Sequence, residues 1–238
     1  MTKPRQNLLH IAPLLAVLAL GALAARPALA QEGIPIPAPA VDVAPNGETT
    51  KVAVLAGGCF WGVQGVFQHV EGVANAVSGY AGGDAATAHY NLVVTGGTGH
   101  AEAVEITYDP EKISYGTLLH VFFSVVHDPT QLDRQGPDIG PHYRSAVFPQ
   151  DEEQERTARA YIAQLNQARV YDAAIVTKLE ADRPFYPAEE YHQDFMTKHP
   201  THPYIVYHDL PKIENLKRLF PELYRTEPAL VSQADGAG

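Results

Sequence analysis

Residues 51–62 read KVAVLAGGCFWG, from Lys51 to Gly62, and the rest of the chain is organised around this stretch. It opens with a short apolar run rich in β-branched side chains, which predicts a strand over 51–56. Beyond the glycine pair, apolar residues at helical spacing predict a helix over 59–70: Phe60, Val63, Phe67 and Val70. The glycines therefore mark a tight strand-to-helix turn, and Cys59 lies in the first turn of the helix.

Cys59 is the only cysteine among 238 residues, and the only tryptophan, Trp61, lies two positions away. A lone cysteine is often no more than a small buried apolar residue. Here the flanking glycines expose the turn, and Phe60 and Trp61 place aromatic surface beside the sulfur. The N-terminal end of a helix stabilises a thiolate, so we expect the pKa of Cys59 to lie below the free value of about 8.5. The pattern favours a nucleophile in an apolar pocket.

Residues 1–30 have the features of a signal peptide. A basic start is followed by a largely apolar stretch over 8–25, and Ala28-Leu29-Ala30 forms a small-residue cleavage signal before Gln31. We expect the protein to be exported to the periplasm, with no stable membrane association after cleavage. An uncleaved membrane anchor is the alternative, and Pro13 within the apolar run argues against it.

The charge of the chain excludes some classes of partner. Removal of residues 1–30 leaves fourteen basic residues against twenty-seven acidic ones, a net charge of −13. Such a chain does not attract a phosphate backbone, so we expect no nucleic-acid partner. With one cysteine it forms no internal disulfide, and its stability must come from a hydrophobic core. We expect a monomer.

The composition divides the chain into four parts. We expect a signal peptide at 1–30, an extended linker rich in proline and alanine at 31–49, a catalytic domain at 50–226 and a flexible tail at 227–238. Beyond the first strand and helix, we expect strands at 72–80, 100–108, 144–148 and 173–179, and helices after caps at Ser114 and Asp151 and over 188–198 and 211–219. Gln154 is expected to complete a capping box with Asp151. This order fits an α/β (α+β) two-layer sandwich, a mixed β-sheet with helices, related to the ferredoxin-like split βαβ plan.

Glu102 lies in the strand expected over 100–108. Since alternate side chains of a strand share a face, Glu102 points to the same side as Val104, Ile106 and Tyr108. Burial disfavours the ionised carboxylate and raises its pKa, and a carboxyl that stays protonated near neutral pH can act as a general acid. A glutamate that merely reaches water from the strand end is the alternative reading.

A long connection over 127–143 carries three prolines, two glycines and several polar side chains, Asp138 and Tyr143 among them. Loops of this length in compact domains are usually functional or disordered, and we favour a functional loop. The glycine cluster at 96–99 lacks the pattern of a nucleotide site. Pro200 and Pro203 break the helix that would align His199 and His202 on a metal, so we expect no bound metal or cofactor.

One ordered set of motifs resembles the A-type peptide methionine sulfoxide reductases over roughly residues 52–198. The motifs are Gly58-Cys59-Phe60-Trp61-Gly62, Gly79-Tyr80-Ala81-Gly82-Gly83, Thr98-Gly99-His100-Ala101-Glu102-Ala103-Val104, His127-Asp128-Pro129, Arg134-Gln135-Gly136, Asp138, Tyr143-Arg144-Ser145 and Phe185-Tyr186-Pro187-Ala188-Glu189. The ordered set is far more specific than any one motif alone.

The resemblance implies a role for each matching residue. Cys59 would attack the sulfur of methionine S-sulfoxide, free or in oxidised proteins, and Glu102 would protonate the oxygen. Tyr90 and Tyr143 would hydrogen-bond that oxygen, with Asp138 as a nearby polar residue of the pocket. The substrate-binding walls around the S-methyl group would be Phe60 and Trp61. The reaction leaves a sulfenic acid on Cys59 that must be reduced before the next turnover.

The chain departs from many members of that family because it carries no second, resolving cysteine. Its segment 199–212 is similar to that of single-cysteine members. We therefore expect an external thiol, from a thioredoxin-like protein or a small molecule, to reduce Cys59 directly. Two other functions are open: a cysteine-dependent hydrolase, in which Cys59 pairs with a histidine, and a non-catalytic thiol sensor.

Overall fold

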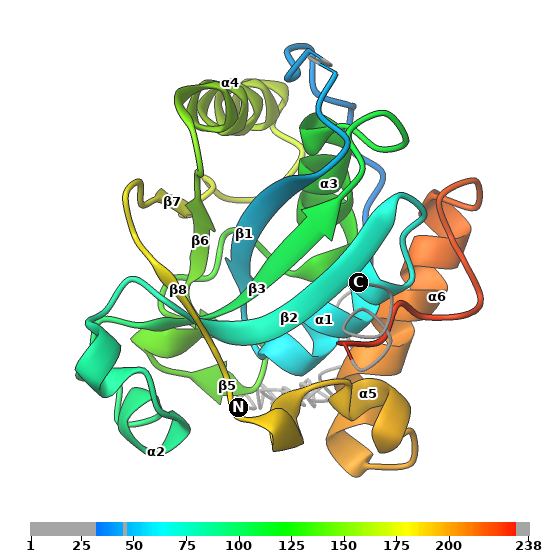
Figure 1. The fold of residues 1–238 in the computed structure, drawn as a ribbon. Coiled ribbons are helices and arrows are strands. Elements are labelled where there is room, and N and C mark those ends of the chain that lie inside the picture. Colours follow the sequence, from blue (N-terminus) through cyan, green and yellow to red (C-terminus); the bar gives the residue numbers. More distant parts are fainter. Residues whose placement is uncertain (1–31, 45–46, 232–238) are drawn as a thin grey trace, which may run out of the picture.

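The computed structural model describes residues 32–44 and 47–231, and its centre is a twisted sheet (Figure 1). Strand β1 (Lys51–Gly57) pairs antiparallel with β3 (Ala101–Tyr108), and β3 pairs antiparallel with β2 (Val73–Ala81). Strands β1 and β2 are therefore parallel, with β3 inserted between them, and helix α1 (Phe60–Gln68) connects them. This arrangement is the expected split βαβ unit.

Three shorter strands extend the sheet, and two more form a hairpin. Strand β6 (Ser145–Phe148) pairs antiparallel with β1, and β7 (Lys178–Leu179) pairs parallel with β6. On the other side, β8 (Phe185–Pro187) pairs with β2, giving the order β7-β6-β1-β3-β2-β8. Strands β4 (Arg134–Gln135) and β5 (Asp138–Ile139) form a separate hairpin. The sheet is mixed, as expected.

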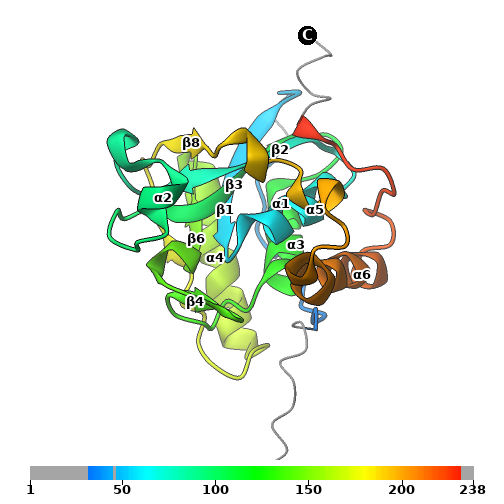
Figure 2. The same ribbon diagram turned by 90° about the horizontal axis from the view of Figure 1, so that it is seen from below.

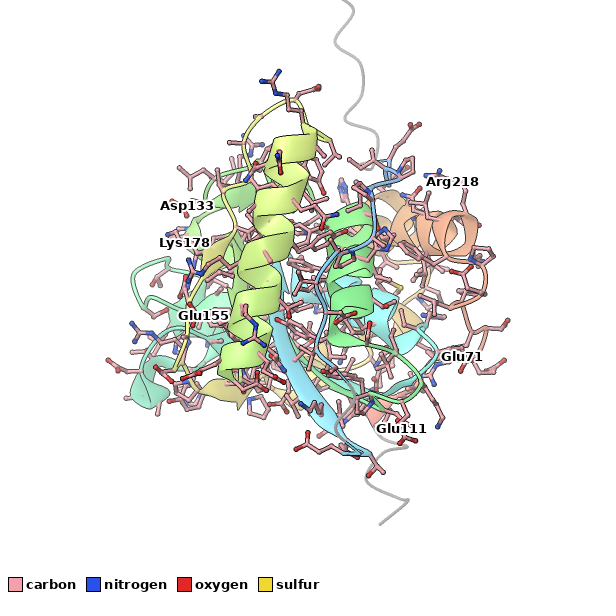
Figure 3. All side chains as sticks on the ribbon, turned by 90° about the horizontal axis from the view of Figure 1, so that it is seen from above. Glu71, Glu111, Asp133, Glu155, Lys178 and Arg218 are labelled. Atoms are coloured by element: carbon pink, nitrogen blue, oxygen red, sulfur yellow. The ribbon has the colours of Figure 1, made fainter. Side chains whose placement is uncertain are left out.

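The longer helices pack on one face of this sheet. Helix α3 (Tyr115–Val121), which a π-helical turn (Phe122–Val126) continues, lies beside α4 (Glu152–Ala168) (Figure 3). Helix α6 (Leu210–Leu219) packs against α1. The remaining helical turns are short: Ala85–Thr87, α2 (Tyr90–Val93), Pro141–Tyr143, Glu190–His192, α5 (Phe195–Lys198) and the π-turn Ile205–Asp209.

Both faces of the central strands are buried. In β1, Ala53 and Leu55 join the main core beneath the helices, whereas Val54 and Ala56 pack in a smaller cluster on the opposite face. That second cluster consists mostly of alanines from neighbouring strands. A near-continuous apolar run such as 51–56 is typical of a strand covered on both sides.

The expected helix caps form, with one difference. The Ser114 hydroxyl accepts a hydrogen bond from the Thr117 N–H at 3.1 Å, and the Asp151 carboxylate accepts one from the Gln154 N–H at 2.7 Å. The Gln154 side chain does not return to Asp151, however. Its oxygen accepts from the Gln150 N–H at 3.1 Å, so the reciprocal half of the capping box is shifted by one residue.

Three expected elements differ from the observed ones. The strand over 173–179 is reduced to β7, because upstream N–H groups bond elsewhere: Ile175 to the Asn166 side chain and Val176 to the Pro129 carbonyl. The helix over 188–198 is interrupted, since Asp194 adopts a positive φ of 58°. Residues 185–187 form an edge strand that the prediction lacked, and the loop over 127–143 contains the β4-β5 hairpin.

The N-terminal segment (residues 32–44) is extended, as expected of the linker, and contains no helix or strand. It is nevertheless packed along α3 towards Arg218 (Figure 3), rather than free of the domain. Its carbonyl groups accept hydrogen bonds from side chains of three helices: His120 to Ile36 (2.8 Å), Tyr161 to Pro37 (2.8 Å), Gln164 to Ala38 (2.8 Å) and Arg218 to Gly33 (2.7 Å). The packed body of the protein therefore begins well before residue 50.

The chain end is also held where it is described. The Ala229 N–H donates to the Gln68 carbonyl at 2.9 Å, and the Val231 N–H donates to the Asp194 carboxylate at 3.1 Å. The expected signal peptide and the end of the expected tail, 232–238, lie outside the described residues. Among the described residues, no helix has the length and apolar character needed to cross a membrane.

Candidate active site around Cys59

The turn between β1 and α1 places Cys59 as the N-cap residue of α1. Gly58 has a φ of 91°, in the left-handed region that favours glycine. A Cβ at this position would also lie 2.6 Å from Cγ of Gln135 in the β4-β5 hairpin. The sequence prediction of a tight glycine turn is confirmed, with Cys59 one residue before the first helical residue. Figure 2 shows α1 in the middle of the molecule, with α2 and β4 to one side and α5 and α6 to the other.

Glu102 of β3 meets this turn. The Phe60 N–H, the first of α1, donates a hydrogen bond to Oε2 of Glu102 at 3.0 Å. Glu102 is 2% exposed, and burial raises its pKa to about 8. The hydrogen bond from Phe60 lowers the pKa and the charge of Asp138 raises it, but burial is the largest effect. The predicted burial of Glu102 on the apolar face of β3, with a raised pKa, agrees with the structure. Glu102 thus binds the residue next to Cys59 and acts electrostatically on the thiol.

The prediction of a lowered pKa for Cys59 is wrong for this structure. Burial raises the pKa of the thiol well above its usual range, and the neighbouring carboxyls of Glu102 and Asp209 raise it further. The backbone N–H of Trp61 donates a hydrogen bond to the sulfur. This bond lowers the pKa of the thiol, but it does not outweigh burial. The Phe60 N–H, which the helix end would offer to a thiolate, is taken by Glu102.

Two tyrosines border the same space. Tyr90 begins α2, and Tyr143 ends the turn Pro141–Tyr143. The pKa of each phenol is raised by burial first and then by the charges of Glu102 and Cys59. Both phenols therefore lie within electrostatic range of both Glu102 and Cys59. The structure thus brings together the residues expected to act on one substrate group.

Glu189 positions Tyr90. Its Oε1 accepts a hydrogen bond from the Tyr90 N–H at 3.0 Å, and its Oε2 accepts one from the Tyr80 hydroxyl at 2.8 Å. Tyr80 lies opposite Glu102 in the register between β2 and β3. The carboxylate therefore connects the sheet to the start of α2.

Asp138 lies in the β4-β5 hairpin and is bonded to a residue that sequence analysis did not identify. The hydroxyl of Tyr204, which precedes the π-turn Ile205–Asp209, donates to Oδ2 of Asp138. Burial raises the pKa of Tyr204, and Cys59 and Asp209 raise it further. Tyr204 thus links the C-terminal part of the chain to the site.

Phe60 and Trp61 lie in a cluster of aromatic rings from several elements. The Trp61 ring stacks on Phe195 with centroids 3.7 Å apart, and its Nε1–H donates to Nδ1 of His192 at 3.2 Å. His192 also lies 4.9 Å from Phe60 and 4.5 Å from Tyr90, measured between ring centroids. Burial lowers the pKa of His192, so the ring is neutral and Nδ1 is free to accept the indole proton.

Sequence reasoning therefore missed five residues around the site: Glu189, His192, Phe195, Tyr204 and Asp209. Glu189 belongs to a quoted motif, and His192 and Phe195 follow it closely, so proximity to that motif was an available signal. Tyr204 and Asp209 lie in the segment 199–212, which the resemblance singled out without giving either residue a role, and they reach the site because the C-terminal segment folds back onto α1.

The described residues offer neither a catalytic histidine nor a metal site at this place. No histidine in this part of the chain bonds the Cys59 sulfur, and the nearby ring nitrogen of His192 already accepts from Trp61. No group of three or more histidine, cysteine, aspartate or glutamate side chains within residues 32–44 and 47–231 is arranged to hold a metal ion. The site combines a thiol, a buried carboxyl with a raised pKa, two phenols and a cluster of aromatic rings. It suits transfer of a proton and attack by sulfur on a small polar group with an apolar neighbour.

Comparisons with known proteins point to one family. The model of the family described as peptide methionine sulfoxide reductase matches residues 51–223. Peptide methionine sulfoxide reductase MsrA 2 of Mesorhizobium japonicum is 61% identical over 191 residues, which cover 80% of this chain and 96% of that protein. MsrA 2 of Synechocystis sp. is 49% identical over 195 residues, covering 81% of this chain and 91% of that protein.

Solved structures agree with these relatives. Methionine sulfoxide reductase A of Corynebacterium diphtheriae aligns with a TM-score of 0.56 at 33% identity and covers 73% of this chain and 89% of its own. Reduced Mxr1 from Saccharomyces cerevisiae aligns with a TM-score of 0.56 at 31% identity, covering 66% of this chain and 90% of its own.

Proposed function

The chain belongs to the peptide methionine sulfoxide reductase family, and from this premise we propose how its own residues reduce methionine sulfoxide to methionine. The Cys59 sulfur attacks the sulfoxide sulfur while the Glu102 carboxyl delivers a proton to the sulfoxide oxygen. The substrate sulfur gains two electrons and becomes the methionine thioether. Cys59 loses two electrons and keeps the oxygen as a sulfenic acid.

The hydrogen bond from the Phe60 N–H to Glu102 carries this proposal, because it sets a carboxyl with a pKa of about 8 beside the nucleophile. A sulfoxide oxygen is a poor leaving group until it is protonated, so a buried acid next to a thiol supplies what the reaction needs. Tyr90 and Tyr143 donate hydrogen bonds to the same oxygen.

Phe60 and Trp61 enclose the S-methyl group in the proposed complex. A hydrophobic pocket discriminates by about 1–3 kcal/mol for each methylene-sized group, which is sufficient to prefer methionine sulfoxide over a bare polar sulfoxide. The stacking on Phe195 and the bond to His192 hold the indole in one orientation. Asp138 supports the pocket through Tyr204.

Exposed apolar side chains support a peptide substrate as well as free methionine sulfoxide. Leu92 follows Tyr90 by two residues, Ile139 follows Asp138, and Tyr191 precedes His192; their exposed fractions are 43%, 72% and 60%. Apolar residues that flank an oxidised methionine in an unfolded protein can rest on such side chains.

We propose that an external thiol completes the cycle. A first thiol condenses with the Cys59 sulfenic acid, forming a mixed disulfide and releasing water. A second thiol, from the same thioredoxin-like protein or from another small molecule, attacks the donor sulfur, regenerates Cys59 and leaves as a disulfide. A donor that lacks its own resolving cysteine should be trapped on Cys59, and failure of every candidate donor to form the mixed disulfide would count against this route.

One assay tests the reductase assignment. Peptides with separated S and R epimers of methionine sulfoxide are incubated with dithiothreitol and either the wild-type protein or Cys59→Ser. We expect wild type to reduce the S epimer only and Cys59→Ser to be inactive. Reduction of both epimers at equal rates, or activity in Cys59→Ser, would refute the assignment. Absence of turnover with intact Cys59 would instead favour a thiol sensor.

We also propose that the protein is exported, which the A-x-A signal before Gln31 supports. We propose in addition that it is a monomer. N-terminal sequencing of the protein from its native host should begin at Gln31, and sedimentation should give a single-chain mass. A cytosolic protein that begins at Met1, or a stable dimer, would contradict this part of the proposal.

A further inference from the structure

Asp209 is a fully buried acidic residue that the proposed reaction does not use. It ends the π-turn Ile205–Asp209, and its side chain is 0% exposed. Oδ1 accepts a hydrogen bond from Nζ of Lys212 at 3.1 Å, and the Lys212 side chain is 14% exposed. Oδ2 is buried and has no hydrogen-bond partner among the described residues. A buried carboxylate with one bare oxygen is costly, which calls for a reason beyond packing.

The Asp209–Lys212 pair lies against the first turn of the helix that carries the nucleophile. A Cβ on Gly62 would lie 2.1 Å from Oδ1 of Asp209 and 2.6 Å from Nζ of Lys212. Gly62 follows Cys59 by three residues, and Figure 2 shows α6 beside α1. The absence of a side chain at Gly62 is what admits both charges to this end of α1.

The charges around Cys59 come from several elements. The carboxyls are Glu102 of β3, Asp209 of the π-turn and Asp138 of β5, and each raises the pKa of the thiol. The phenols that respond to Cys59 are Tyr90, Tyr143 and Tyr204. Around Asp209 itself, burial raises its pKa, Lys212 and His208 favour its ionised form, and Asp138 opposes it.

We propose that Asp209 and Lys212 are positioning residues that control the charge state of Cys59: the Asp209 carboxylate restrains ionisation of the nucleophile, and the Lys212 ammonium limits that restraint. The proposal rests on the role of Cys59 as the nucleophile in the proposed function. A charge near a buried group shifts the pKa of that group by about one unit or more. The Lys212 ammonium, 3.1 Å from Oδ1 of Asp209, offsets part of the carboxylate charge.

Such control has a chemical purpose in a single-cysteine enzyme. A thiolate is the form that oxidants attack, and further oxidation beyond the sulfenic acid is irreversible. A carboxylate that keeps the resting sulfur protonated protects it between turnovers. Lys212 limits this effect, so that Cys59 can still ionise when the sulfoxide is bound.

Because Cys59 is the only cysteine, alkylation by iodoacetamide reports on this one sulfur without any turnover. The rate is measured against pH for the full mature chain, wild type, Asp209→Asn and Lys212→Met. We expect Asp209→Asn to lower the midpoint pH of alkylation by about one unit, and Lys212→Met to raise it, because the ammonium then no longer offsets the carboxylate charge. Asp209→Asn should also lose activity faster in hydrogen peroxide.

The same helix offers a matched control. Lys217 and Glu214 form an exposed pair at the same spacing, with nitrogen and oxygen 2.7 Å apart. Lys217→Met and Glu214→Gln should leave the alkylation midpoint where it is in wild type. Lys212→Arg should restore the wild-type midpoint, which a purely structural role for Lys212 does not require.

Equal midpoints in wild type, Asp209→Asn and Lys212→Met, or shifts of both variants in the same direction, would overturn the proposal. If Asp209→Asn fails to fold, the upward shift in Lys212→Met and its reversal in Lys212→Arg still decide the question. Failure of the reductase assay would leave these midpoints measurable, so the two hypotheses fail separately.

Discussion

At the scale of single residues, two glutamates of one strand show how position decides chemistry. Glu102 and Glu105 lie on opposite faces of β3, and Glu102 is 2% exposed on the face of the main core. Burial raises the pKa of both carboxyls, but only Glu102 meets the helix end that carries Cys59. Alternation along a strand identified this residue from sequence, because a period of two depends only on local backbone geometry.

Glu102→Gln should lower kcat/KM for a methionine sulfoxide peptide by about 100-fold to 10,000-fold, since the amide retains the shape but cannot donate the proton. Steady-state kinetics with dithiothreitol measures the loss. Glu105→Gln is the matched control on the opposite face of the strand and should retain near wild-type rates. Comparable losses in both variants would indicate a general effect on the sheet rather than acid catalysis.

The raised pKa of Glu102 also makes stability depend on pH. Its folded-state value of about 8 lies above that of an unfolded glutamate, so between the two values the folded protein holds a proton that the unfolded chain has released. This contribution to stability is full below the unfolded pKa and is lost as pH rises towards 8. The Tm of wild type relative to Glu102→Gln should therefore fall between pH 5 and pH 9, and a constant difference would contradict the assignment.

At the scale of elements, local signals located most helix starts correctly but not the broken segments. Ser114 and Asp151 cap their helices as predicted, because a cap requires only a side chain and an N–H three residues apart. The helix expected over 188–198 is interrupted at Asp194, whose carboxylate accepts from Gln68 of α1 at 2.8 Å. A partner distant in the chain decided that conformation.

Asp151→Ala should destabilise the protein by about 1 kcal/mol, because the Gln154 N–H loses its acceptor at the start of α4. Urea unfolding at neutral pH measures the change. Asp172→Ala, at an exposed position after the same helix, should change the free energy of unfolding by less than about 0.5 kcal/mol. A loss in Asp172→Ala as large as that in Asp151→Ala would argue against the cap.

At the scale of the whole molecule, segments far apart in the sequence enclose the site and the core. Helix α1 is buried on nearly all sides, because α5 and α6 cover the face that its own sequence pattern leaves open. A methyl group on Gly65 would lie 2.4 Å from Met196, which shows how closely this covering layer approaches. The N-terminal segment packs along α3 and reaches α6 at Arg218 (Figure 3).

A chain that begins at residue 47 should unfold at a lower temperature than one that begins at residue 32, by about 5 °C. The shorter chain loses several hydrogen bonds to helix side chains, together worth about 2 kcal/mol, and a protein of this size loses about 2–4 °C for each kcal/mol. Calorimetry compares the two, and their kcat values should be equal because the segment contributes no group to the site. Equal unfolding temperatures would show that the N-terminal segment contributes no stability.

The sequence by itself determined the strand-turn-helix around Cys59, the face on which Glu102 lies and the aromatic pair beside the sulfur, since periodicity and glycine turns act between near neighbours. Only the tertiary structure decided the pKa of Cys59, the arrival of Tyr204 and Asp209 at the site and the docking of the N-terminal segment. The physical reason is that burial and charge at one atom sum over every element packed around it, and those elements come from parts of the chain more than a hundred residues apart.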